Sequence, residues 1–192
     1  MARPKSFDDA AVLDRALQLF RQRGFEGTSM SDLEAHLGLG RQSLYNTFGD
    51  KRELYLKALD LYQRQANGQM LAMLEAPDAG LDALERWLAA NAATVTVPGA
   101  PAGCFTVNSI VERPDDAPTA ARCTRGRECL TAAIRAALSR AQAKGQIAAE
   151  RDVEGLVGLV VAHVYGLAVL ARSGATEREL GAASGALMAL VR

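Results

Sequence analysis

The sequence predicts an all-α protein of about nine helices, with a small N-terminal unit and a larger C-terminal one. Apolar residues make up 49% of the chain and aromatic residues only 5%, and alanine and leucine dominate the apolar set. β-Branched residues are sparse outside residues 94–97 and 157–161, which disfavours strands. Apolar residues also recur at helical spacing, first at Leu13, Ala16, Leu17 and Phe20, and this indicates helices with one buried stripe.

The first helix is expected to follow a short basic arm, residues 1–5. Ser6, with Asp9 three residues later, matches a helix N-cap. Gly24 stands where a helix usually ends, because glycine accepts the left-handed backbone conformation found there. We therefore expect one helix between these two signals.

A helix-turn-helix is expected within residues 28–55. Ser29 and Asp32 have the spacing of a capping box for the second helix, and Gly38 and Gly40 bracket a tight turn. The third helix, residues 41–46, has only Leu44 as a clear core residue. Its remaining side chains are polar and suit base edges and phosphates.

Six more helices are expected in the larger unit, residues 51–192, and the first of them is shared with the smaller unit, residues 1–50. Asp50 with Glu53 opens this shared helix, which we expect to run to about residue 74. Gly and Pro punctuation places the others at about residues 81–94, 104–112, 119–144, 152–173 and 176 to near the C-terminus. Asp152 and the pair Thr176 and Glu179 are expected to cap the last two.

The last two helices predict a homodimer interface. The eighth is apolar on all sides, so it must be covered on both, and the ninth carries small residues that permit close approach. The alternative is that both are interior helices of a monomer. The apolar run 155–171 is shorter than the roughly 20 residues that a membrane span needs, so no membrane partner is expected. The expected interface residues are Leu156, Leu159, Val160, His163, Leu167, Ala183, Leu187 and Leu190.

The charge balance excludes binding of nucleic acid by bulk attraction. The chain has 22 basic and 22 acidic residues, for a formal net charge of +0, and residues 1–55 are balanced too. Any DNA affinity must therefore rest on placed contacts and helix N-termini. The three cysteines are an odd number, and the first residues contain no apolar signal segment, so we expect a reducing cytoplasm.

Two stretches carry a resemblance to a known family. They read A-L-x-L-F-x-x-x-G-F-x-x-T-S-M-x-D-L from Ala16 and L-Y-N-T-F-G-D-K-R-E-L-Y from Leu44. This pattern resembles the TetR/AcrR family of transcriptional regulators. The resemblance implies a homodimer bound to a palindromic double-stranded DNA operator. The dimer would repress transcription until a small-molecule effector in the larger domain moves apart the two smaller units, residues 1–50 of each chain, which we call the reading heads.

The resemblance also implies which residues touch DNA. Bases would be read by Arg41, Gln42, Ser43 and Asn46, and phosphates would be held by Thr28, Ser29, Tyr45, Thr47 and Lys51. Two readings stay open: Tyr45 as a packing residue and Lys51 as a solvated cation at a helix start. Gly40 departs from the family pattern, where a Ser or Thr cap is common, as do Asn46 and Thr47, where aromatic or His residues are frequent.

An effector pocket, largely apolar with a few polar tips, is expected between the helices of the larger unit. For each single candidate a core role is favoured over ligand contact, and His163 is expected to be a core or interface histidine. No His, Cys and Asp cluster has metal spacing, so neither a metal nor another cofactor is expected. The candidate lining residues are Tyr62, Trp87, Asn91, Cys104, Phe105, Asn108, Cys123 and Tyr165.

The cysteines raise an alternative, a thiol- or electrophile-sensing repressor. Cys123 and Cys129 are six residues apart on one expected helix, about 9 Å along its axis, and cannot bond to each other. Cys104 could approach Cys123, and the neighbouring Arg122 and Arg125 could lower a thiol pKa. Inert buried thiols remain the favoured interpretation.

Other functional classes find little support. The chain has no G-x-S-x-G, G-x-G-x-x-G, P-loop or H-E-x-x-H motif and only two histidines, so it is not expected to be an enzyme. A ligand-binding module without DNA binding is the other alternative, and the polar face of residues 41–46 argues against it. The sequence leaves open whether the regulator represses or activates.

Overall fold

The computed structural model describes residues 7–192, apart from the side chains of residues 67, 69 and 70. Over this range the chain forms ten helices and no strand. The expected basic arm and Ser6 lie outside the described residues. The helices are α1 Asp9–Arg23, α2 Met30–Leu37, α3 Arg41–Phe48, α4 Lys51–Met70, α5 Ala72–Glu75, α6 Leu81–Val95, α7 Phe105–Glu112, α8 Ala117–Ala143, α9 Val153–Arg172 and α10 Glu177–Val191.

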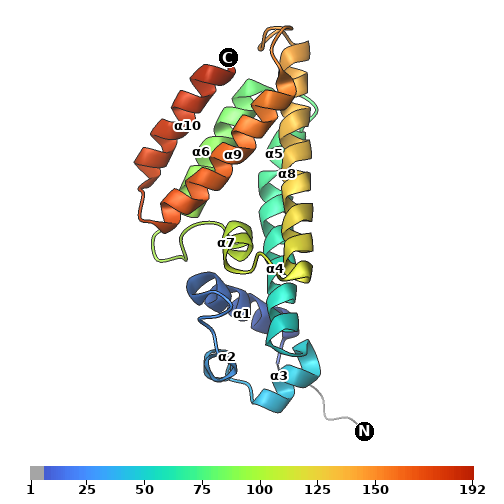
Figure 1. The fold of residues 1–192 in the computed structure, drawn as a ribbon, viewed down its shortest axis with the longest axis vertical. Coiled ribbons are helices and arrows are strands. Elements are labelled where there is room, and N and C mark those ends of the chain that lie inside the picture. Colours follow the sequence, from blue (N-terminus) through green and yellow to red (C-terminus); the bar gives the residue numbers. More distant parts are fainter. Residues whose placement is uncertain (1–6) are drawn as a thin grey trace.

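The molecule is elongated, with α1, α2 and α3 at one end (Figure 1). Helix α4 rises from this end and runs alongside α8, while α6, α9 and α10 form the other end and α7 lies between the two groups (Figure 1). The all-α fold with an N-terminal helix-turn-helix, predicted from the sequence, is confirmed.

The structure corrects two expectations about helix ends. The expected fourth helix is interrupted at Leu71, so α4 and α5 replace it; the weak helix former Gly68 lies just before the break. The first helix is capped by Asp8, whose carboxylate accepts a hydrogen bond from the Ala10 backbone N at 2.9 Å. An aspartate one residue before the helix directly satisfies an N–H of the first turn.

The other caps follow the sequence signals. The capping box of Ser29 and Asp32 is complete, since each side chain accepts a hydrogen bond from the other residue's backbone N. The same reciprocal pattern starts α10 at Thr176 and α4 at Asp50. Asp152 stands at the N-cap of α9 without a side-chain hydrogen bond to the helix.

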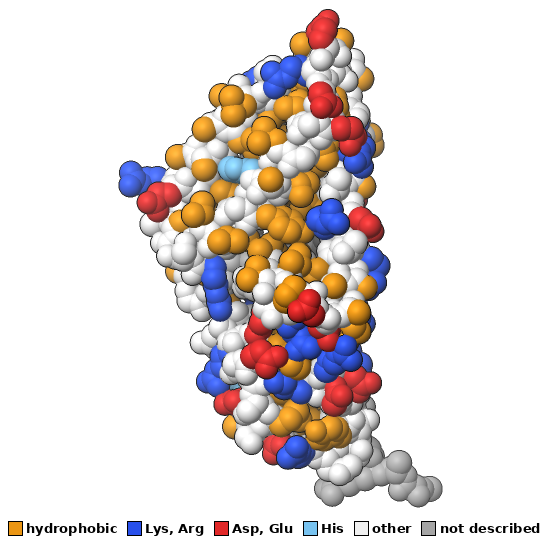
Figure 2. Space-filling view, in the orientation of Figure 1, with side chains coloured by type: hydrophobic (Ala, Val, Ile, Leu, Met, Phe, Trp, Pro, Cys, Tyr) orange, Lys and Arg blue, Asp and Glu red, His pale blue; other side chains and the backbone are white. Residues whose placement is uncertain are grey.

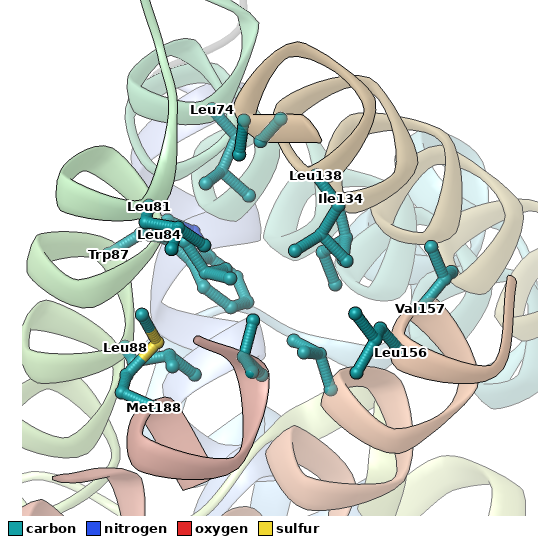
Figure 3. Packing of buried hydrophobic residues seen from close by; sticks show 14 of the residues in the cluster. Leu74, Leu81, Leu84, Trp87, Leu88, Ile134, Leu138, Leu156, Val157 and Met188 are labelled. Atoms are coloured by element: carbon teal, nitrogen blue, oxygen red, sulfur yellow. The ribbon is translucent and has the colours of Figure 1, made fainter. Parts of the chain in front are cut away.

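Two large apolar clusters fill the fold. The upper one joins α5, α6, α8, α9 and α10, and Figure 3 shows Leu74, Trp87, Ile134 and Leu156 converging from four of these helices. The lower cluster joins α1, α2, α3 and α4 and also takes in Phe105 of α7. Each fully buried large apolar side chain contributes roughly 1.5–3 kcal/mol, so both clusters bind the helices firmly.

The lower cluster is centred on Tyr55, which is fully buried in α4. Its ring makes edge contacts with Phe20, Phe25 and Phe105, with centroids 5.1, 5.1 and 5.3 Å away. The Tyr55 hydroxyl donates to Ser109 Oγ at 2.7 Å, and burial raises the pKa of this phenol to about 12. The core of the N-terminal helices therefore extends into α7 of the larger unit.

Helices α9 and α10 leave apolar side chains uncovered. Figure 2 shows these side chains gathered over this end of the molecule, while the charged residues concentrate around the N-terminal helices. Helix α9 has 20 residues, so by length and composition alone it could cross a membrane, which corrects the expectation that the apolar run is too short. One of its faces packs into the upper cluster. The exposed apolar residues on the two helices are Leu159, Val169, Leu170 and Leu190.

Candidate nucleic-acid interface and effector cavity

Helices α2 and α3 are held together by a glycine turn and by buried apolar anchors. Gly38 has φ 67, in the left-handed region, and its backbone N donates to Glu34 O at 3.0 Å. Leu33, Leu37 and Leu44 are at most 1% exposed. The anchors fix the angle between the helices, so the opposite face of α3 is presented at a fixed orientation.

That face of α3 is polar and solvent-exposed. Arg41, Gln42, Ser43 and Asn46 are all exposed, and Gln42 Nε2 donates to Asn46 Oδ1 at 3.0 Å. The Arg41 guanidinium lies 5.8 Å from the centre of the Tyr45 ring. Amide and guanidinium groups in this arrangement can reach base edges in a major groove. Gly40 is the N-cap of α3 and makes no side-chain cap bond, so no side chain of the N-cap covers the N-terminus of this helix, where an anion can bind.

The expected phosphate-binding residues differ in their exposure to solvent. Ser29 and Tyr45 are exposed, and Thr47 is half-buried. Thr28 is fully buried, and its hydroxyl donates to Gly24 O at 2.6 Å, so that hydroxyl faces the protein interior.

Lys51 is engaged inside the N-terminal unit. Its ammonium donates to Phe25 O and Thr28 O at 3.0 and 2.9 Å and lies 3.9 Å from the centre of the Phe25 ring. These contacts give Lys51 a packing role in the structure, beyond the two roles considered from the sequence.

A cavity of about 330 Å³ lies between α1, α4, α6, α7, α8 and α9. Of the expected lining residues, Tyr62, Trp87, Asn91, Cys104 and Tyr165 border it. Several other lining residues were not predicted, because packing between distant helices brings them to the cavity. They include Arg21, Gln63, Leu71, Thr106, Val107, Gly126, Leu130, Val164 and Ala168.

Three expected lining residues lie outside this cavity. Phe105 and Asn108 border a second hollow of about 450 Å³ between α1, α7 and the C-terminal end of α9. Cys123 is buried in the lower cluster, with its Sγ 3.6 Å from Thr106 O. Helix α7 thus lies between the two hollows, and Val107 borders both.

The thiols do not form a reactive pair. Arg122, expected to activate Cys123, instead donates to both carboxylate oxygens of Asp60 at 2.9 and 3.0 Å. Burial, with a smaller effect of Cys104, raises the pKa of Cys123 to about 11. The alternative in which Arg122 lowers the Cys123 pKa finds no support, because neighbouring helix residues point in directions about 100° apart. The favoured interpretation of an inert thiol agrees with the burial of Cys123. Cys104 is half-buried and accepts a hydrogen bond from the Tyr62 hydroxyl at 3.4 Å.

Helix α7 connects the cavity to the N-terminal unit. Its N-cap, Cys104, borders the cavity. At its other end the Glu112 carboxylate accepts hydrogen bonds from the backbone N of Phe25 and of Glu26, at 3.0 and 2.9 Å. The Arg113 guanidinium that follows lies 3.7 Å from the centre of the Phe25 ring. We call Glu112 and Arg113 with the Phe25–Glu26 turn the α7 latch.

Asp116 joins the α7 latch to α4 and α8. Its carboxylate pairs with Arg52 of α4 and Arg113 at 2.6 and 2.9 Å, and it caps α8 through Thr119. Burial alone would raise the pKa of this group, but the hydrogen bonds from Thr119, Arg52 and Arg113 hold it well below its usual value. Asp116 is therefore ionised and ties three helices together.

The expected dimer residues fall into two sets. Leu156, Val160, Leu167 and Leu187 are at most 7% exposed and face the core of their own chain. Leu159 and Leu190 are 42% and 63% exposed, and Ala183 is half-buried, packed against a small cluster that includes Leu167 and Leu180. His163 is half-buried, with Nε2 3.1 Å from Ser184 Oγ, and burial lowers its pKa. Of the predicted interface residues, Leu159, Leu190, Ala183 and His163 are therefore the ones that can meet a partner.

Family comparison agrees with this architecture along most of the chain. A family model described as "Bacterial regulatory proteins, tetR family" matches residues 12–58. Another, described as "Tetracyclin repressor-like, C-terminal domain", matches residues 80–187.

Individual proteins are similar over nearly the whole length. The chain is 37% identical over 158 residues to the HTH-type transcriptional regulator YezE of Bacillus subtilis (strain 168), covering 81% of each. It is 32% identical over 190 residues to the HTH-type transcriptional repressor ComR of Escherichia coli (strain K12), covering 98% of this chain and 90% of that one. A cysteine mutant of the TetR family transcriptional regulator CifR, complexed with 26bp double-strand operator DNA, has a TM-score of 0.89 and 26% identity, with 100% of both chains covered.

Proposed function

This chain belongs to the TetR family of bacterial regulatory proteins, and we propose that it represses transcription as a cytoplasmic homodimer until a small molecule enters the cavity. The observation that carries the proposal is the exposed polar face of α3 on its buried anchors. A surface helix with this composition contributes little to the core, and its side chains match base edges and phosphates. The operator complex of the similar CifR supports a double-stranded DNA partner for this chain.

The proposed division of labour places DNA contacts in residues 1–50 and effector binding and dimerisation in residues 51–192. Arg41, Gln42, Ser43 and Asn46 would read bases, and Ser29, Tyr45 and Thr47 would hold phosphates. Pairing through α9 and α10 would cover the exposed apolar side chains of both helices, as family dimers require. Two reading heads would then face two half-sites of a palindrome.

The α7 latch gives the proposed repressor a route for release. An effector that fills the cavity contacts α7 near Cys104, and the far end of this helix holds the Phe25–Glu26 turn of the reading head. Helix α9 reinforces the link, because Arg172 donates to Arg21 O and Gln22 O at 3.3 and 3.2 Å. A shift of α7 would therefore change the angle and spacing of the two heads, and with them the fit to DNA.

A DNA selection followed by two substitutions tests the proposal. Duplexes recovered from a random pool should converge on a palindrome. Arg41→Ala and Gln42→Ala should each weaken binding to that site by roughly 1–3 kcal/mol, about five- to 150-fold. Arg86→Ala is the control, because Arg86 is an exposed arginine of α6, on the larger unit, that pairs with Asp82. Wild-type affinity in the Arg41/Gln42 double variant would refute the assignment of the α3 face.

A further inference from the structure

The cavity has an uneven distribution of charge. Of the described residues that border it, Arg21 alone is charged, and none of them carries a carboxylate. Arg21 donates to Pro101 O at 3.1 Å and to Gln18 Oε1 at 3.4 Å, and its guanidinium lies 5.4 Å from the centre of the Tyr62 ring. Among the described residues it forms no ion pair. A guanidinium has five N–H donors, so this cation retains donors for an anion.

The same cavity contains two polar groups without partners. Trp87 is 2% exposed, and its indole N–H has no hydrogen-bond partner in the described structure. Asn91 Oδ1 is also buried and unpartnered there. Both residues line the cavity from α6, and their spacing of four residues places them one helical turn apart on the same face. A buried polar group without a partner is unfavourable, so this donor and this acceptor, both unpartnered, can each gain a hydrogen bond from a ligand in the cavity.

The rest of the lining restricts the ligand's body. Leu71, Val95, Val107, Leu130 and Val164 supply an apolar wall, and a cavity of about 330 Å³ is near the lower limit for small-molecule sites. A compact hydrocarbon body is therefore favoured over a sugar, a nucleotide or a peptide.

We infer that the effector is a compact hydroxy acid, whose carboxylate lies against Arg21 and whose hydroxyl accepts from Trp87 and donates to Asn91. The role of this ligand as an effector rests on the proposed function, whereas its chemical class rests on the lining of the cavity alone. A hydroxyl is the simplest group that satisfies a donor and an acceptor one turn apart. An amine in place of the carboxylate would meet Arg21 with like charge and would be rejected. Since Arg21 belongs to α1, the carboxylate would also contact the reading head directly.

Trp87 is the one tryptophan of the chain, so its fluorescence reports on this cavity. The probes are 3-(4-hydroxyphenyl)propanoate, tyramine, which has an amine in place of the acid, and 3-phenylpropanoate, which lacks the hydroxyl. An aliphatic set, 8-hydroxyoctanoate, octanoate and octylamine, covers a non-aromatic body. In at least one set the hydroxy acid should bind about tenfold or more tightly than the compound without the hydroxyl, and the amine should not bind.

Substitutions assign each group. Arg21→Gln should weaken both acids about tenfold or more, Arg21→Lys should restore part of the binding, and the exposed Arg15→Gln on the same helix should change nothing. Asn91→Leu should remove the preference for the hydroxyl while leaving the acid bound. Trp87→Phe should also remove the preference for the hydroxyl and leave the acid bound. Binding to this variant is measured by thermal shift, because the tryptophan fluorescence is lost.

The outcomes separate the two proposals. Tighter binding of an amine than of its acid, equal binding with and without the hydroxyl, or no binding of either hydroxy acid at millimolar concentration would overturn the ligand class. Failure of the wild-type protein to bind any selected DNA would overturn the proposed function and leave the probe results standing. Binding of a hydroxy acid without release of DNA would retain the ligand class and remove only the proposed release.

Discussion

The α7 latch can be opened by one substitution, Glu112→Ala. The Glu112 carboxylate accepts two backbone hydrogen bonds, at 3.0 and 2.9 Å, from a turn more than 80 residues away in the sequence. Hydrogen bonds to charged groups contribute about 1.5–3 kcal/mol each. The bond to Glu26 N is solvent-exposed, so water replaces part of it, and we expect a total loss of about 2 kcal/mol in the free energy of unfolding.

The measurement is urea unfolding, followed by titration of the selected operator. Without the latch the reading head would no longer be held at one angle, so operator affinity should fall several-fold, and any effector should change that affinity less than in the wild type. Glu154→Ala is the matched control, since it removes a carboxylate that is 64% exposed and paired with Arg135; such a surface pair contributes at most about 1 kcal/mol. If Glu112→Ala unfolds like Glu154→Ala and binds the operator like the wild type, α7 does not transmit the signal.

Three further predictions concern single side chains. Lys51→Ala should cost about 1–2 kcal/mol of stability through its two lost hydrogen bonds, with little change in the salt dependence of DNA binding; a fall of about one in the salt slope would instead indicate a phosphate contact. Asp116→Asn should flatten the loss of stability on acidification: because the folded pKa of Asp116 is lowered, its stabilisation is complete above its unfolded pKa of about 4 and is lost as pH falls below that value. Urea midpoints at neutral and acidic pH measure this, and parallel wild-type and variant curves would contradict it. Leu159 is 42% exposed on an apolar face, and Leu159→Glu puts a charge there. The dissociation constant of the dimer, measured by sedimentation equilibrium, should rise more than tenfold; an unchanged constant would place the interface elsewhere.

Local signals were sufficient to predict most of the fold. The capping pairs at Ser29 and Thr176 and the helix-ending Gly24 act within a few residues, so the sequence alone locates them. Trp87 and Asn91 could be placed together for the same reason, because four residues make about one helical turn.

Long-range packing could not be predicted in the same way. Nothing near Arg21 distinguishes it from Arg23, yet Arg21 reaches Pro101 O and the cavity, while Arg23 pairs with Asp32. The role of Glu112 was equally unpredictable, because its partners lie on the Phe25–Glu26 turn, which is distant in the sequence and near only in the folded chain. Lys51 looked free for phosphates because the carbonyls that it binds belong to residues outside its own helix.

The core around Tyr55 affects how such proteins can be recombined. Phe20 and Phe25 from the N-terminal helices meet Tyr55 and Phe105 in one aromatic cluster, so a cut at residue 50 would divide a single hydrophobic core. A reading head transplanted alone onto another regulator would lose the faces that complete it. A functional chimera should therefore carry the first turns of α4 together with the matching α7, and evolution would be expected to exchange these segments as one inherited block.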